Sequence, residues 1–92
     1  MTISWSQRAL KQLRAAHEYI YQNDPQAARE FVEATDALGE LLRTYPNMGI
    51  ATDAPEVKVF PLVRYRYLVF YKILGEQEVR IMRIRHAARK TL

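Results

Sequence analysis

The sequence predicts an α+β fold of order β-α-α-β-β-β, in which an N-terminal helical hairpin packs on one face of an antiparallel sheet. Up to about residue 43, apolar residues recur at steps of three and four, which is the spacing of amphipathic helices. After a loop rich in turn residues, apolar and polar residues alternate with the period of a strand. The chain has 92 residues, 49% hydrophobic and 26% charged, a composition that fits one globular domain over 1–92.

The first half of the chain contains one short strand and two helices. Residues 2–5 are β-prone, and Ser6 is a suitable N-cap for a helix over 7–22. Asp24 can cap the second helix, over 25–43, and Pro25 at its first position loses no hydrogen bond. Two helices joined by so short a link are expected to pack as an antiparallel hairpin.

The second half predicts three strands. Pro46 and Gly49 supply turn chemistry, and an irregular loop follows to residue 55. Strands are expected over 56–61, 64–74 and 78–85, the last two joined by a hairpin. Sequential hairpins make this sheet antiparallel, and the strand over 2–5 most simply pairs within it. Tyr65, Tyr67 and Tyr71 alternate, which favours a packed sheet face over stacking on bases.

Positive charge is concentrated towards the C-terminus. The formal net charge is +4, but residues 1–55 carry a net charge of −2 and residues 56–92 a net charge of +6. Such a surface attracts phosphate groups or an acidic protein, although it can also serve solubility alone. Within it, Arg83 and Arg85 are expected to face one side of their strand, opposite Met82 and Ile84.

Several classes of protein are excluded by composition. Without cysteine the chain has no disulfide or thiol chemistry, which suits a reducing cytosol. The N-terminus does not resemble a signal peptide, and no uncharged stretch is long enough to cross a bilayer. We therefore expect a cytoplasmic protein without a membrane partner. Two histidines without a matching set of carboxylates do not indicate a metal site, and no cofactor is expected.

Five segments occur in a fixed order: ISWSQRAL, YIYQNDPQAAREF, LLRTYPNMG, YLVFYKI and VRIMRIRHAARK. In this order and spacing they resemble the RelE/ParE toxins of bacterial type II toxin–antitoxin modules, over nearly the whole chain. The resemblance implies a three- or four-stranded antiparallel sheet carrying a helical hairpin. It also implies a cognate antitoxin whose flexible segment wraps the toxin and holds it inactive. The antitoxin-binding residues are left unassigned.

One branch of this family, the RelE-like toxins, cuts messenger RNA in the ribosomal A site. The ribose 2′-OH attacks the adjacent phosphate, which needs an acid, a base and cations against the developing charge. For such a nuclease, His86 is the candidate acid or base and Tyr71 a secondary proton donor. The candidate phosphate clamps are arginines, whose forked guanidinium pairs two oxygens: Arg64, Arg83, Arg85 and Arg89.

The other branch, the ParE-like toxins, binds DNA gyrase and traps its cleaved DNA complex without catalysis. RelE-like strands usually read Tyr-Arg-x-x-Tyr, whereas here Leu68 stands at the arginine position. The ending instead matches the His-x-x-Arg segment common in ParE-like chains. The expected target-binding residues form the basic end of the chain: Arg83, Arg85, His86, Arg89 and Lys90.

Three functions therefore stand in order. The preferred one is a toxin that poisons DNA gyrase and is neutralised by a cognate antitoxin. The alternative is a ribosome-dependent mRNA endonuclease, for which RNA and the ribosome would be the partners. The third is a non-toxic binding module, because Leu68 and Ile50 depart from the residues usual in relatives; Ile50 replaces the arginine of a Pro-x-x-Gly-Arg turn.

Overall fold

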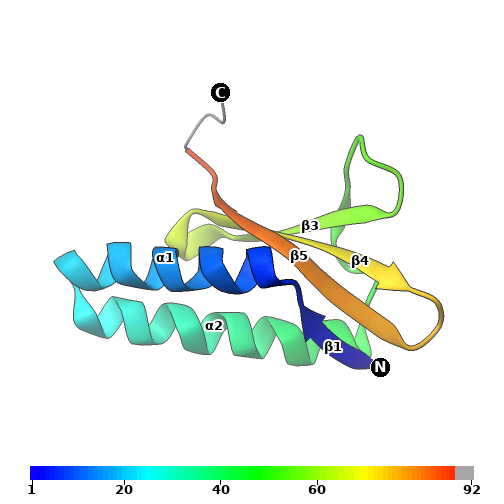
Figure 1. Ribbon diagram of the computed structural model, residues 1–92, viewed down its shortest axis with the longest axis horizontal. Helices are drawn as coiled ribbons and strands as arrows, with labels where there is room; N and C mark the ends of the chain where they lie inside the picture. The colour runs from blue at the N-terminus through cyan, green and yellow to red at the C-terminus, as the bar shows by residue number, and fades with distance from the viewer. Residues whose placement is uncertain (89–92) are drawn as a thin grey trace.

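The computed structural model describes residues 1–88 and confirms the α+β fold class (Figure 1). Five strands form one sheet in the order β1-β5-β4-β3-β2. The two helices form a hairpin that covers one face of this sheet (Figure 1). The elements in chain order are β1 (Thr2–Trp5), α1 (Gln7–Asn23), α2 (Pro25–Thr44), β2 (Ile50–Ala51), β3 (Val57–Leu62), a 3₁₀ turn (Val63–Tyr65), β4 (Tyr67–Leu74) and β5 (Glu78–His86).

Both helices begin at the predicted caps. The Ser6 hydroxyl accepts a hydrogen bond from the Ala9 amide at 3.0 Å. The Asp24 carboxylate accepts two, from the amides of Gln26 and Ala27, each at 3.1 Å. These bonds satisfy amides that have no partner within the first turn of a helix. Each helix ends one residue later than the sequence predicts.

The sheet is mixed, because β1 pairs with β5 in parallel, from Thr2 opposite Glu78 to Trp5 opposite Ile81. Hairpins make β3, β4 and β5 antiparallel, which leaves the outer side of β5 for β1. The hydroxyl of Ser4 donates to the Glu78 carboxylate at 2.6 Å, and Arg80 donates to the same oxygen at 3.0 Å. The Ser4 bond, and then Arg80, lower the pKa of Glu78. Periodicity identified β1 as a strand but did not determine its direction.

Strand β4 begins later than residue 64, where the sequence placed it. Val63–Tyr65 form a 3₁₀ turn, and Arg66 adopts a left-handed conformation with φ 62°. The Arg66 carbonyl accepts a hydrogen bond from the Ala87 amide at 2.7 Å, which holds this turn against the end of β5. Tyr65 therefore does not continue the strand face, although it packs on Phe31 at 5.5 Å. The loop expected to be irregular contains the two-residue strand β2, paired with β3.

A β-bulge in β5 alters the simple alternation. Phe70 pairs with Arg83 and Tyr71 pairs with Ile81, so Met82 is the extra residue. Ile81 and Ile84, three positions apart, are consequently both buried on the helix side. Arg83 lies with Phe70 on the face away from the helices, opposite Ile84 as predicted.

Tyr71 anchors the loop that follows α2. Its ring is fully buried in the core, and its hydroxyl donates to the Pro46 carbonyl at 2.8 Å while accepting from the Gly49 amide at 2.9 Å. A β-carbon on Gly49 would lie 2.5 Å from this hydroxyl. A side chain at residue 49 would therefore displace either the loop or the tyrosine. Burial raises the pKa of Tyr71 above 10.0, an effect that the Gly49 hydrogen bond partly opposes.

Two glycine substitutions should have opposite effects on stability. Gly49→Ala is expected to lower the free energy of unfolding by roughly 2 kcal/mol, because the new methyl group breaks the Tyr71 contact. Gly39→Ala should raise it by about 1 kcal/mol, because alanine is the better helix former and a β-carbon there meets Ile3 only at 3.8 Å. Urea unfolding of both variants measures the difference. Equal effects would contradict the assigned role of Gly49.

Tyr71→Phe should cost about 1–3 kcal/mol, because it leaves the Gly49 amide and the Pro46 carbonyl without their partner. The raised pKa of Tyr71 stabilises the fold fully below the ordinary value of 10.0, and this contribution is lost as the pH rises through the higher pKa of the folded state. Wild-type protein should therefore lose more stability than Tyr71→Phe between neutral and strongly alkaline pH. Tyr45→Phe, at an exposed position, is the control and should follow the wild type.

Candidate functional site

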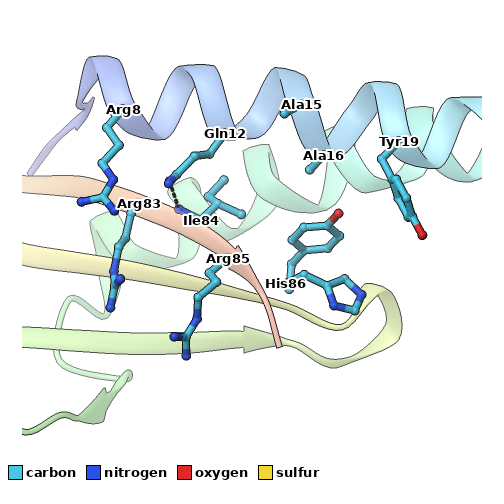
Figure 2. A pocket seen from close by; sticks show the side chains of 10 residues that line it. Arg8, Gln12, Ala15, Ala16, Tyr19, Arg83, Ile84, Arg85 and His86 are labelled. Carbon is cyan, nitrogen blue, oxygen red and sulfur yellow. Dashed lines mark hydrogen bonds between the residues drawn. The ribbon is translucent and has the colours of Figure 1, made fainter. Parts of the chain in front are cut away.

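A cleft of about 320 Å³ lies between α1 and the C-terminal half of β5 (Figure 2). Strand β1 ends at Trp5, opposite Ile81, so beyond that point β5 is bordered by α1. We call this hollow the α1/β5 cleft. Its lining residues are Arg8, Gln12, Ala15, Ala16, Tyr19, Tyr67, Arg83, Ile84, Arg85 and His86.

One end of the α1/β5 cleft is cationic. Arg8 from α1 meets Arg83 and Arg85 from β5, and no carboxylate of residues 1–88 lines the cleft. Burial lowers the pKa of Arg83, and the positive charges of Arg85 and Arg8 lower it further. Charges of the same sign held together cost stability, which is a common feature of functional sites.

Phe70 provides the platform for two of these arginines. The guanidinium of Arg83 lies 4.1 Å from the centre of the Phe70 ring, and that of Arg85 lies 5.6 Å from it. A cation over an aromatic face is attracted by the ring quadrupole. The ring thus limits the positions that two long side chains adopt and keeps both guanidinium groups at the rim of the cleft.

Helix α1 is hydrogen-bonded to the edge of β5 on either side of Arg83. The hydroxyl of Ser6 donates to the Met82 carbonyl at 2.7 Å. The Gln12 side-chain carbonyl accepts from the Ile84 amide at 2.7 Å (Figure 2). An unpaired edge amide is a common point of attachment for another strand. Gln12 occupies that point at Ile84.

His86 enters the same cleft from the other face of β5. It pairs in register with Tyr67, and the two rings meet edge to face at 5.0 Å. Its Nδ1 accepts a hydrogen bond from the Ala88 amide at 3.2 Å, so the neutral ring carries its proton on Nε2. Because side chains alternate along a strand, His86 lies on the helix side with Tyr67, whereas Arg85 lies on the opposite side.

The structure brings only part of the predicted nuclease set together. Arg83, Arg85 and His86 line one cleft. Tyr71 is buried in the core, with its hydroxyl bonded to the Pro46 loop. Arg64 lies in the 3₁₀ turn, paired with Glu30 at 3.1 Å, and does not line the cleft. The predicted residues Arg89 and Lys90 lie outside the described residues.

The contribution of α1 was missed by sequence reasoning. Arg8, Gln12 and Tyr19 share one helix face that borders β5, and their spacing is compatible with such a stripe. One signal was present in the sequence. Arg8 stands in the first helical turn, which contains no acidic residue, although acids are favoured there by the helix dipole.

The described part of the chain does not suggest a metal centre. Within residues 1–88, no three histidine, aspartate or glutamate side chains gather closely enough to hold an ion. Neither of the helices in this part is both long and apolar enough to cross a membrane.

Comparisons with known proteins identify the family. Residues 3–91 match the family model described as the ParE toxin of type II toxin–antitoxin system, parDE. Toxin RelE2 of Caulobacter vibrioides is 36% identical over 89 residues, which cover 95% of this chain and 96% of that protein. Putative toxin Y4kP of Sinorhizobium fredii is 29% identical over 85 residues, covering 92% and 86% respectively. The chain belongs to the ParE toxin family of type II toxin–antitoxin systems, within the RelE/ParE superfamily.

Solved structures confirm the fold. The chromosomal ParDE system from P. aeruginosa contains a chain that superposes with a TM-score of 0.74 at 21% identity, covering 94% of this chain and 95% of that one. The intact E. coli RelBE toxin–antitoxin complex gives a TM-score of 0.66 at 20% identity, covering 96% and 98%. The RelE/ParE-like architecture predicted from the sequence is therefore confirmed.

Gln12→Ala tests the attachment of α1 to β5. Loss of the acceptor should cost about 1 kcal/mol and expose the Ile84 amide to water. Hydrogen exchange measured residue by residue should show faster exchange at Ile84 and an unchanged rate at Val79, which is paired on β1 and β4. Lys11→Ala, at an exposed position of the same helix, is the control. An unchanged rate at Ile84 would show that the Gln12 bond does not protect it.

Proposed function

We propose that this toxin arrests growth by binding DNA gyrase through the cationic rim of the α1/β5 cleft, without catalysis of its own, and that a cognate antitoxin neutralises it. The observation that carries this proposal is the composition of the cleft. Three arginines line it without a carboxylate of residues 1–88. An inhibitor that acts by binding needs only a complementary charged surface, and such a surface provides specificity and fast association.

The position of His86 favours binding over RNA cleavage. A nuclease needs its acid or base and its phosphate-binding cations on the same reacting group. Here His86 lies on the helix side of β5 against Tyr67, and Arg85 lies on the other side. Tyr71, the second proton donor considered, is fully buried. Leu68, opposite Arg85 in the sheet, supplies no charge where RelE-like strands usually carry arginine.

Neutralisation by an antitoxin is supported by the complexes of similar proteins. E. coli RelE is known in an intact RelBE toxin–antitoxin complex, and a two-arginine mutant of RelE is known bound to an antitoxin RelBc peptide. The sequence left Leu10, Phe31 and Leu38 as either core or antitoxin-binding residues. Phe31 and Leu38 are buried in the core, whereas Leu10 is 37% exposed beside the cleft. Leu10 is thus the apolar residue of this set that an antitoxin can reach.

Inducible expression without the antitoxin tests the target. Wild-type protein should induce the DNA-damage response and accumulate cleaved DNA bound to gyrase. The double variant Arg83→Ala with Arg85→Ala should need at least about tenfold more protein for the same arrest, because each arginine removes a charge from the contact surface. Antitoxin binding and thermal stability report whether the variant is folded. Arg80→Ala, on the same strand but paired with Glu78 outside the cleft, should remain as toxic as wild type.

Two results would overturn this assignment. Rapid codon-specific cutting of messages, abolished by His86→Ala, would replace gyrase binding with ribosome-dependent nuclease activity. Normal growth at high expression would indicate a binding module without toxicity. Full toxicity of the double-arginine variant would show that the toxin uses another surface.

A further inference from the structure

Arg8 occupies a position that does not favour a cation. Ser6 caps α1, and Arg8 is the second residue of the helix, in a first turn without an acidic residue. The N-terminus of a helix carries a partial positive charge, which repels a guanidinium and attracts a carboxylate. Helix stability therefore does not explain this residue, and a binding role does.

Arg8 and Arg83 extend towards each other from opposite sides of the α1/β5 cleft (Figure 2). Their proximity contributes to the lowered pKa of Arg83, after burial and Arg85. The ion pairs among residues 1–88 involve other arginines, namely Arg43, Arg64 and Arg80. Arg8 and Arg83 thus form an unneutralised cationic pair within this part of the chain, and an anion from a partner would relieve their repulsion.

The other end of the cleft has a different chemistry. Ala15 and Ala16 form its floor on α1, and the rings of Tyr19 and Tyr67 stand beside them (Figure 2). At about 1.5 Å per helical residue, Tyr19 lies roughly 16 Å along α1 from Arg8. A nucleic-acid backbone carries charge at every unit and would meet cations at one end only. A peptide with an acidic side chain at one end and an apolar one about four residues away fits both ends.

Gln12 determines how such a peptide is held. Its side chain already accepts the hydrogen bond of the Ile84 amide at the edge of β5. A partner strand that added to the sheet here would have to displace it. The free groups of the cleft are side chains, so recognition proceeds through guanidinium and ring contacts.

We propose that the α1/β5 cleft binds an acidic segment of the target protein, with a carboxylate between Arg8 and Arg83 and an apolar side chain against the Tyr19 end. This inference rests on the proposed function, because it assumes that the target is a protein. It makes Arg8 a specificity-determining residue of the surface formed by Arg83 and Arg85.

The charge reversal Arg8→Glu separates binding from folding. Glutamate suits the first turn of a helix, so the melting temperature should equal or exceed that of wild type. The protein concentration that half-inhibits supercoiling by purified gyrase should nevertheless rise at least about tenfold, because an acid replaces the partner of a carboxylate. Arg14→Glu makes the same charge change at an exposed position of α1 outside the cleft, and it should inhibit as wild type does.

A direct binding measurement keeps this inference independent of gyrase. The probe is a fluorescein-labelled nonapeptide, Gly-Asp-Asp-Ser-Gly-Ser-Leu-Leu-Gly, and its control has Asn-Asn in place of Asp-Asp. Fluorescence polarisation should show binding of the acidic probe to wild type and Arg14→Glu, and at least about tenfold weaker binding to Arg8→Glu.

The outcomes distinguish the two proposals. If wild type does not inhibit gyrase but the probe binds through Arg8, gyrase is the wrong target and the acidic-peptide site stands. If wild type and Arg8→Glu inhibit gyrase equally, the proposed function stands and the role of Arg8 is wrong. Equal binding of the two peptides, or no binding of either, would also overturn the inference. So would displacement of the probe by a ten-nucleotide RNA at lower concentration than by unlabelled peptide.

Discussion

The contact of Ser6 with the edge of β5 is the constraint on which the rest of the structure depends. The amide of Ser6 donates to the Ile81 carbonyl, and its hydroxyl donates to the Met82 carbonyl while capping α1 through Ala9. One residue thus ends β1, begins α1 and fixes the helix beside the bulge of β5. Because β1 stops here, the last residues of β5 are bordered by a helix, and the cleft lies between them.

The bulge at Met82 gives β5 two different faces. It allows Ile81 and Ile84 to share the core, and beyond it Arg83 rests on the outer face against Phe70. A strand that must both close a core and present charge is well served by such an irregularity, which re-aims side chains without interrupting the sheet. Phe70 offsets part of the cost of burying a guanidinium, since a cation gains from contact with an aromatic face.

The same cleft shows how a shared fold can support different targets. RelE/ParE-like chains have a common sheet and helical hairpin, so activity depends on which side chains reach the site. In this chain the cations and the histidine reach the cleft from opposite faces of β5. The residues of α1 add a cation and an amide to the side facing β5. This combination is better suited to holding a charged partner than to moving a proton between reacting atoms.

The sequence alone determined the features that depend on near neighbours. The helix caps at Ser6 and Asp24, the turn residues and the periods of helix and strand all act over a few positions, and together with the order of five motifs they indicated the family. Only the tertiary structure decided the parallel pairing of β1, the bulge and the arrival of α1 at the cleft. These features depend on contacts between distant residues, since Ser6 and Met82 are 76 positions apart and Gln12 and Ile84 are 72. Local patterns carry no record of such partners, because a free edge is equally ready to pair with any segment that the fold brings to it.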